Sequence, residues 1–245
     1  MNQAVLLIAR QGLVEGLRSG VGITLSIAYV SACSVYTFTL YPFFTEGEAN
    51  LRPLFDFIPF LLVLLAPTLT MQLLTMEQHN RSLDKWLVRP LSYPELLLGK
   101  LGGAWLLFAL TSILSLCLPI ILSLFIKLHW PNLLSAYLGI LLLGTMNLCI
   151  GLWASIFTKS PLSAWLLSFT ICFSFYIIGV SSRFLPSLLA EWSQLLSSQQ
   201  HVSRLVLGIV DSRDLIYFFG MIWFWFTLAV ETLRAKVNRS TTIVR

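Results

Sequence analysis

Few residues of this sequence could do chemistry, and none forms a recognisable catalytic pattern. The only Gly-Lys pair, Gly99-Lys100, lacks the upstream glycine of a phosphate-binding P-loop, so the chain does not bind ATP by that route. The HExxH and GxSxG motifs of metalloproteases and serine hydrolases are absent. His79, His129 and His201 are scattered, and each is expected to be a loop or interface residue rather than a metal ligand. The sequence therefore predicts no catalytic, cofactor-binding or metal site.

The acidic residues also avoid the apolar parts of the chain. All 11 Asp and Glu residues fall in predicted loops or at the ends of apolar stretches. A charge at the centre of a membrane helix costs about 2.5–3.5 kcal/mol on insertion scales, and where one is kept it commonly serves proton or ion coupling. Coupling to sodium through backbone carbonyls stays open. A transporter with this sequence is expected to take its energy from a partner protein.

The elements that position these residues are expected to be membrane helices. The chain has 245 residues, of which 57% are hydrophobic and 11% charged, whereas soluble domains have about 45–50% and 25%. We expect an all-α integral membrane protein with one transmembrane domain over residues 1–245. Its six transmembrane helices are expected at about 21–41, 57–76, 97–126, 133–158, 162–182 and 215–233.

The distribution of basic residues predicts the orientation. With the N-terminus in the cytoplasm, 11 of the 16 Lys and Arg residues lie in inside segments, which also places the C-terminus inside. The net charge of +5 is thus explained by topology, and no nucleic-acid partner is expected. The Cys residues lie in apolar runs and are expected to be small buried side chains: Cys33, Cys117, Cys149 and Cys172.

Two segments next to the predicted spans have helical patterns of their own. Residues 3–18 form an amphipathic pattern typical of a helix on the cytoplasmic membrane surface. Gly12, Gly16 and Gly20 follow at four-residue spacing, and we expect them to mark the bend into the first span, the alternative being a close helix contact. Hydroxyl residues of spans one and five could line a polar path, although such groups more often bond back to their own helix. They are Ser26, Ser31, Ser34, Thr37, Thr39, Ser168, Thr170 and Ser174.

The segment between the second and third spans carries a helix-start signal. Ser92 and Glu95 have capping-box spacing and Pro94 suits a first helical turn, so the third helix is expected to begin before the membrane. Pro90 separates it from a short helix at 82–88, which would lie across the mouth of a helical hairpin. The alternative for 82–88 is a solvated loop with an interfacial tryptophan.

The segment 181–214 on the outer side is too long for a simple turn. An apolar face after Pro186 predicts an interfacial or re-entrant helix that includes Trp192. A second short helix is expected at 201–207, before Gly208.

Three stretches, 54–100, 151–164 and 208–217, resemble ABC-2 type transporter permeases, and among them the GldF-like branch named for gliding-motility transporters. The first contains an acidic start, an Arg-Pro pair and Gly99-Lys100. The second reads GLWASIFTKSPLSA and the third GIVDSRDLIY. The three stretches occur in the order found in the family.

The resemblance implies the permease half of a transporter in the cytoplasmic membrane of a bacterium, and export is the direction that it leads us to expect. Its partners would be a separate P-loop ATPase subunit and a second permease subunit, either a copy or a relative of this chain. The segment 82–88 would be the helix that couples to the ATPase. The coupling residues would be Glu77, Ser82, Leu83, Asp84, Trp86, Leu87, Arg89 and Pro90.

A further hypothesis concerns three charged residues before the last span. Asp211, Arg213 and Asp214 could form an outer-gate network, or only a local ion pair with Asp214 as the helix N-cap. Two other functions also stay open for the whole chain. One is a secondary transporter that works without nucleotide, and the other is a membrane scaffold without a translocation path.

Overall fold

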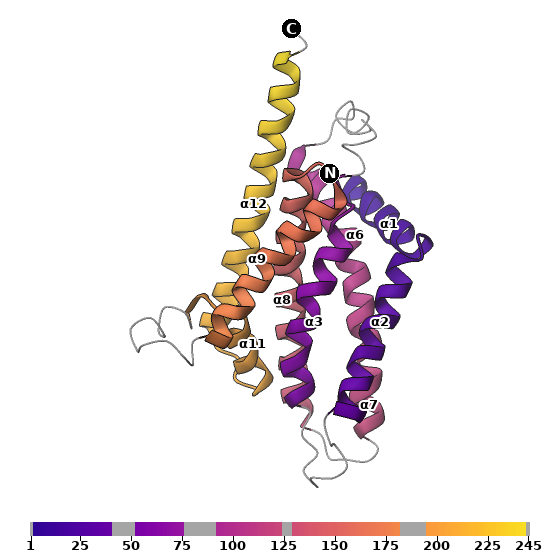
Figure 1. The fold of residues 1–245 in the computed structure, drawn as a ribbon, viewed down its shortest axis with the longest axis vertical. Helices are drawn as coiled ribbons and strands as arrows, with labels where there is room; N and C mark the ends of the chain where they lie inside the picture. Colours follow the sequence, from indigo (N-terminus) through magenta and orange to yellow (C-terminus); the bar gives the residue numbers. More distant parts are fainter. Residues whose placement is uncertain (1, 41–51, 76–91, 124–128, 182–194, 244–245) are drawn as a thin grey trace.

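The computed structural model describes residues 2–40, 52–75, 92–123, 129–181 and 195–243, and within these ranges it contains helices and no strand (Figure 1). Six helical segments are long and apolar enough to cross a membrane, as the sequence predicts. The helices are α1 Asn2–Arg18, α2 Val21–Val35 with the π-helical turn η1 Tyr36–Leu40, α3 Arg52–Thr70, α6 Tyr93–Ser115, α7 Cys117–Ser123, α8 Trp130–Phe157, α9 Pro161–Ser181, α11 Ser198–Val206 and α12 Ser212–Ile243.

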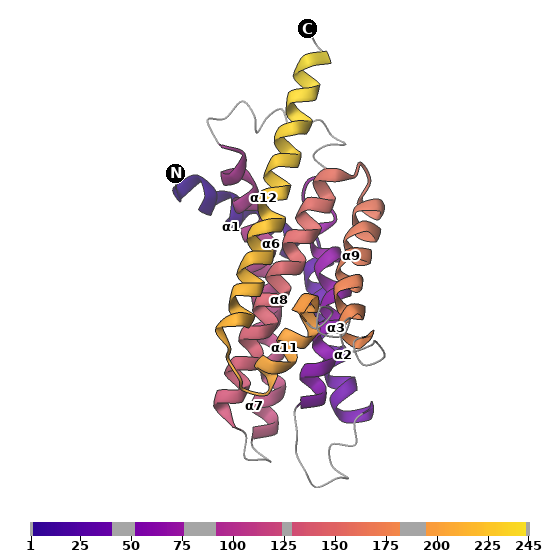
Figure 2. The same cartoon turned by 90° about the vertical axis from the view of Figure 1, so that its left-hand side faces the viewer.

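Helix α8 forms the centre of the bundle and packs against α3, α6, α9, α11 and α12 (Figures 1 and 2). Its glycines allow this close approach. A Cβ at Gly144 would lie 2.1 Å from the ring of Phe108, and a Cβ at Gly151 would lie 1.9 Å from Thr70 Oγ1. Small residues at these positions let neighbouring helices make the van der Waals contacts that hold membrane bundles together.

The outer helices of the bundle keep large apolar surfaces uncovered. For example, the side chains of Ile216 and Trp223 in α12 are 70% and 73% exposed, and that of Leu162 in α9 is 68% exposed. In water this surface would drive association, so its natural neighbours are lipid tails or another membrane subunit.

The hydroxyl residues of the first and fifth spans mostly bond back to their own helices. Ser34 donates to the carbonyl of Val30, Ser168 to that of Ala164, and Ser174 to that of Thr170. Ser26 also makes a 2.7 Å hydrogen bond with Thr111 and so joins α2 to α6. The sequence left open whether these hydroxyls line a polar path or bond to their own helix, and the structure shows hydrogen bonds to their own helix.

The start of α6 follows its local sequence signal. The carboxylate of Glu95 accepts hydrogen bonds from the backbone N–H of Ser92 at 2.9 Å and from its hydroxyl at 2.7 Å. The helix begins at Tyr93, with Pro94 in the first turn, where no N–H is required. Among the cysteines, Cys117 departs from expectation because it is exposed, at the point where α6 gives way to α7, whereas the other three are buried.

Helix α1 packs along the first half of α6, and this contact corrects the interpretation of the glycines. A Cβ at Gly103 would lie 3.0 Å from both the Ala9 carbonyl oxygen and the Gly12 Cα, so Gly12 lies in a close helix contact and does not mark a bend. Gly16 lies against Leu107 of α6 in the same interface. Only Gly20 stands at the turn into α2, with a φ of 72° that favours glycine.

Replacing Gly103 by valine is expected to push α1 away from α6, because the atoms in its way are backbone and cannot rotate aside. Overpacking of this kind costs about 1–3 kcal/mol, which corresponds to a fall in Tm of about 2–12 °C. Thermal unfolding in detergent measures it. The matched control is Gly220→Val in α12, where an added Cβ meets nothing within 4 Å. Equal behaviour of the two variants would contradict the proposed α1–α6 contact.

Two predicted features lie outside the described residues. They are the short helix at 82–88, with all the residues expected to couple to the ATPase, and most of the first short helix of the outer segment. The second outer helix is present as α11.

Candidate functional site

Polar and charged side chains that link neighbouring helices lie at both ends of the bundle. We call them the α1 end, where α3 ends and α6 begins, and the α11 end, where α12 begins (Figure 1).

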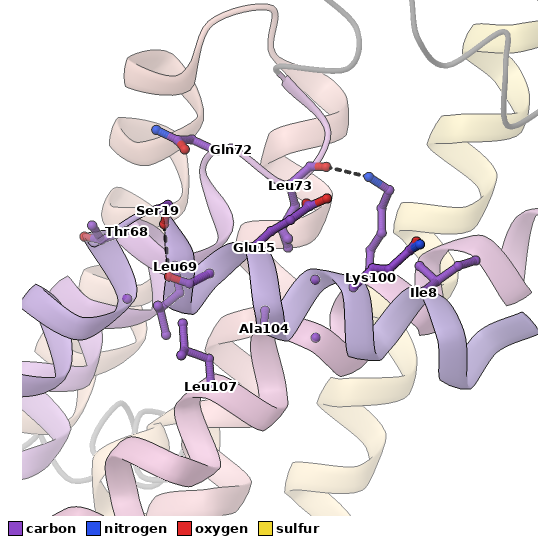
Figure 3. Close-up of a pocket in the computed structure, with 15 residues that line it drawn as sticks. Ile8, Glu15, Ser19, Thr68, Leu69, Gln72, Leu73, Lys100, Ala104 and Leu107 are labelled. Carbon is purple, nitrogen blue, oxygen red and sulfur yellow. Dashed lines mark hydrogen bonds between the residues drawn. The ribbon is translucent and has the colours of Figure 1, made fainter.

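At the α1 end, Lys100 ties together the helices that flank segment 76–91. Its ammonium donates a 2.9 Å hydrogen bond to the carbonyl of Leu73, in the turn that follows α3 (Figure 3). Carbonyls at a helix C-terminus lack intrahelical partners and carry partial negative charge, which a lysine ammonium satisfies. The two residues are 27 positions apart, so this bond joins the chain just after α3 to the first turns of α6.

Helix α1 is attached to the same place. Ile8 packs against Gly99, the residue before Lys100, and a Cβ at Gly99 would lie 2.8 Å from the Ile8 side chain. A cleft of about 380 Å³ opens between α1, α3 and α6, with Glu15, Gln72 and Lys100 among its polar lining residues (Figure 3). Because α1, α3 and α6 are linked here, a displacement of one helix end is expected to move all three.

A second lysine fastens α12 to α8 at this end of the bundle. Lys236 donates a 2.8 Å hydrogen bond to the carbonyl of Ile156, near the C-terminus of α8. One turn earlier on α12, Thr232 accepts a 3.2 Å hydrogen bond from the indole N–H of Trp153. The α12–α8 pair is therefore held by polar contacts as well as by apolar packing.

At the α11 end, three ionisable side chains meet at Asp214. Its carboxylate has no exposed surface, and its Oδ1 lies 2.6 Å from His201 Nδ1 and 3.0 Å from Arg204 Nε. Arg204 Nη2 also donates to Oδ1, and Nε is 3.2 Å from Oδ2. A buried carboxylate needs such partners, because leaving it unpaired would cost several kcal/mol. We call His201, Arg204 and Asp214 the outer cluster, after the side of the membrane that the sequence predicts for this segment.

The outer cluster also holds the chain that leads into α11. His201 Nε2 lies 3.1 Å from the carbonyl oxygen of Leu195, and the Tyr217 hydroxyl donates a 2.8 Å bond to the carbonyl of Leu196. The rings of His201 and Tyr217 stack with centroids 4.0 Å apart. These contacts join α12 to α11 and to the two residues before it.

The other charged residues predicted for this site lie outside the outer cluster. Asp211 is the N-cap of α12, since its carboxylate accepts a 3.0 Å bond from the backbone N–H of Arg213. Asp214 is therefore not the cap, and its ion-pair partner is Arg204 rather than Arg213. The side chain of Arg213 is exposed.

Sequence reasoning missed His201 and Arg204. Their spacing of three residues places both side chains on one face of α11, and Asp214 stands in the first turn of the apolar helix α12. A His/Arg pair on one helix, followed by an acidic residue at the start of the next, was the signal that the sequence offered. The partner could not be identified, because pairing them with Asp214 requires the turn at Gly208, where φ is 83°.

Comparison with known proteins supports the interpretation drawn from the sequence. Curated proteins give no significant match. A family model described as ABC-2 family transporter protein matches residues 5–227, which covers every span found in the structure except the last residues of α12. The chain therefore belongs to the ABC-2 transporter family and is a membrane subunit of an ABC transporter.

Proposed function

We propose that this chain is the permease subunit of an ATP-driven exporter of the GldF-like branch. It works with a separate P-loop ATPase and pairs with a second permease, a copy or a relative of itself. Both termini lie in the cytoplasm, and the α1 end therefore faces the ATPase. The observation that carries the proposal is the family match over residues 5–227, which includes the segment between α3 and α6.

Coupling enters the permease between α3 and α6. The segment 82–88 binds the ATPase, and its movement passes to the ends of both flanking helices, which Lys100 joins through the Leu73 carbonyl. Gly99 and Gly103 then transmit it to α1 by direct packing. The Lys100–Leu73 hydrogen bond is needed because, without it, bending of the chain between α3 and α6 would absorb the movement of segment 82–88 and the helices would stay in place.

The outer cluster forms the gate at the opposite end. It fixes α11 to α12 through Asp214, while Asp211 and Arg213 stand beside it at the start of α12. An outward opening that separates α11 from α12 must break these buried contacts. Apart from gating, the cluster stabilises the fold, so gating has to be tested separately from stability.

Lys100→Met tests the coupling route. The loss of a hydrogen bond from a charged donor, about 1.5–3 kcal/mol, is expected to lower permease-stimulated ATP hydrolysis at least about tenfold while the ATPase still binds. ATP hydrolysis by the complete complex in nanodiscs is the measurement. Lys159→Met, at an exposed lysine between α8 and α9, is the matched control.

Retention of normal stimulation in Lys100→Met would refute the role of the Lys100 link. Transport that continues after ATP depletion, driven by an ion gradient, would replace the whole proposal with a secondary transporter. A stable complex without any nucleotide-dependent change would indicate a scaffold.

A further inference from the structure

Helix α1 presents polar residues to the cleft at the α1 end and apolar residues to its surroundings. Gln11 and Glu15 line the cleft, whereas Leu6 and Leu7 are exposed on the face turned away from α6. A helix on the surface of a soluble bundle exposes its polar residues instead. Arg10 is exposed on the same side as the leucines, and its long side chain can reach water from the membrane boundary. The exposed apolar face of α1 therefore belongs in lipid.

The cleft opens at the depth of the lipid head groups. An amphipathic helix lies with its apolar face about 5–10 Å into the boundary between head groups and acyl chains, and α1 forms one wall of the cleft. Leu69 and Leu107 line the cleft with apolar surface, as does the backbone of Gly22 at the start of α2. Beyond that glycine, α2 exposes Ile23 and Ile27, which are one helical turn apart. Acyl chains can cover this surface while the head group lies in the cleft.

Opposite charges stand on different walls of the cleft. Glu15 of α1 supplies a carboxylate and Lys100 of α6 an ammonium, and Figure 3 shows both side chains extending toward Leu73. A carboxylate accepts hydrogen bonds and an ammonium donates them, while the amides of Gln11 and Gln72 do both. The cleft has a volume of about 380 Å³, which lies within the range of about 300–1,000 Å³ found for ligand pockets. A ligand complementary to these walls carries an anion and a cation a few atoms apart.

We infer that the cleft binds the head group of a zwitterionic phospholipid with a primary ammonium, of which phosphatidylethanolamine is the type. The phosphate lies beside Lys100, and the ammonium donates hydrogen bonds to Glu15. An anionic head group has no cation to offer Glu15 and is repelled by it. The bound lipid contacts α1, α3 and α6 together and so braces the three helices that meet at Lys100. It is a lipid held by the protein and is distinct from any substrate that the transporter carries.

Native mass spectrometry of the purified, delipidated protein tests the inference. Phosphatidylethanolamine and phosphatidylglycerol with the same acyl chains are titrated separately. Wild type is expected to bind phosphatidylethanolamine about fivefold more tightly, the effect of one exposed ion pair. Glu15→Gln should lose this preference, and Glu15→Lys should reverse it, because two ammonium groups then attract the anionic lipid. Glu231→Gln removes an exposed carboxylate of α12 and is the control, which should keep the wild-type preference.

Equal binding of the two lipids by wild type, or a preference for phosphatidylethanolamine that survives in Glu15→Lys, would overturn the inference. Glycerophosphoethanolamine, which is the head group without acyl chains, distinguishes a lipid from a soluble ligand. If it binds as tightly as the lipid, the cleft is a site for a soluble zwitterion and the lipid site is refuted.

Hydrogen–deuterium exchange of wild type decides the question if the Glu15 variants do not fold. Peptides covering residues 8–19 are compared in nanodiscs of the two lipids. Exchange should be slower in phosphatidylethanolamine, and equal exchange in both lipids would refute the proposal.

These measurements use no nucleotide, so they are separate from the test of the proposed function. A lipid preference without permease-stimulated ATP hydrolysis would refute the exporter and leave the lipid site standing. Normal stimulation without a lipid preference would do the reverse.

Discussion

Asp214→Asn is expected to loosen the α11 end of the protein and to lower its stability by about 3 kcal/mol. Breaking one side of a buried ion pair typically costs about 3–5 kcal/mol. The lower value applies because Arg204 is 42% exposed and water can solvate it when its partner is lost. His201, which is 4% exposed, has no such relief. Thermal unfolding of the purified protein should show a fall in Tm of about 6–12 °C.

Neighbouring aspartate and arginine residues supply the matched comparison. Asp211→Ala removes only a helix cap and should cost about 1 kcal/mol. Arg213→Ala changes an exposed side chain and should stay within about 0.5 kcal/mol of wild type. A loss of stability in Arg213→Ala as large as that in Asp214→Asn would contradict the assignment of Arg204 as the partner. Loss of transport in Asp211→Ala and Arg213→Ala, with stability intact, would instead place both residues in the gate.

The features that the sequence predicted correctly are those set by local pattern. Runs of apolar residues identify the six spans because each must present a continuous apolar surface to lipid. The start of α6 follows from Ser92 and Glu95, which are only three residues apart and need no other part of the chain. The same holds for the turn at Gly20, where a single backbone angle requires glycine.

The features that were missed depend on which helices meet. Gly12 contacts Gly103, 91 positions away, and no local pattern distinguishes such a contact from a bend. Likewise, His201 and Arg204 become partners of Asp214 only because the chain reverses at Gly208. Amphipathic periodicity shows that a face is buried, but it does not show what covers it.

The double replacement Trp86→Ala and Leu87→Ala is expected to have the largest effect on function. Both residues lie in the predicted coupling segment 82–88 and supply its large apolar side chains. Truncation of a central tryptophan anchor commonly costs at least 2 kcal/mol at an interface, which raises Kd about 30-fold or more. We expect the ATPase to dissociate during purification or to lose its stimulation by the permease.

A control pair of large apolar residues lies at the α1 end of the bundle, outside the predicted coupling segment. Phe157, the last residue of α8, and Leu162, near the start of α9, are 61% and 68% exposed. Replacing both by alanine removes a similar apolar area outside the coupling segment. ATPase binding should then stay close to that of wild type.

The central claim is that this chain is an ABC permease driven through segment 82–88. Its most direct test is to co-purify the tagged chain with its candidate ATPase and to measure ATP hydrolysis in nanodiscs, for wild type and for the Trp86→Ala, Leu87→Ala variant. We predict that wild type retains and stimulates the ATPase and that the variant loses binding or stimulation while remaining folded. If no ATPase associates with wild type, or if the folded variant behaves like wild type, the central claim is wrong.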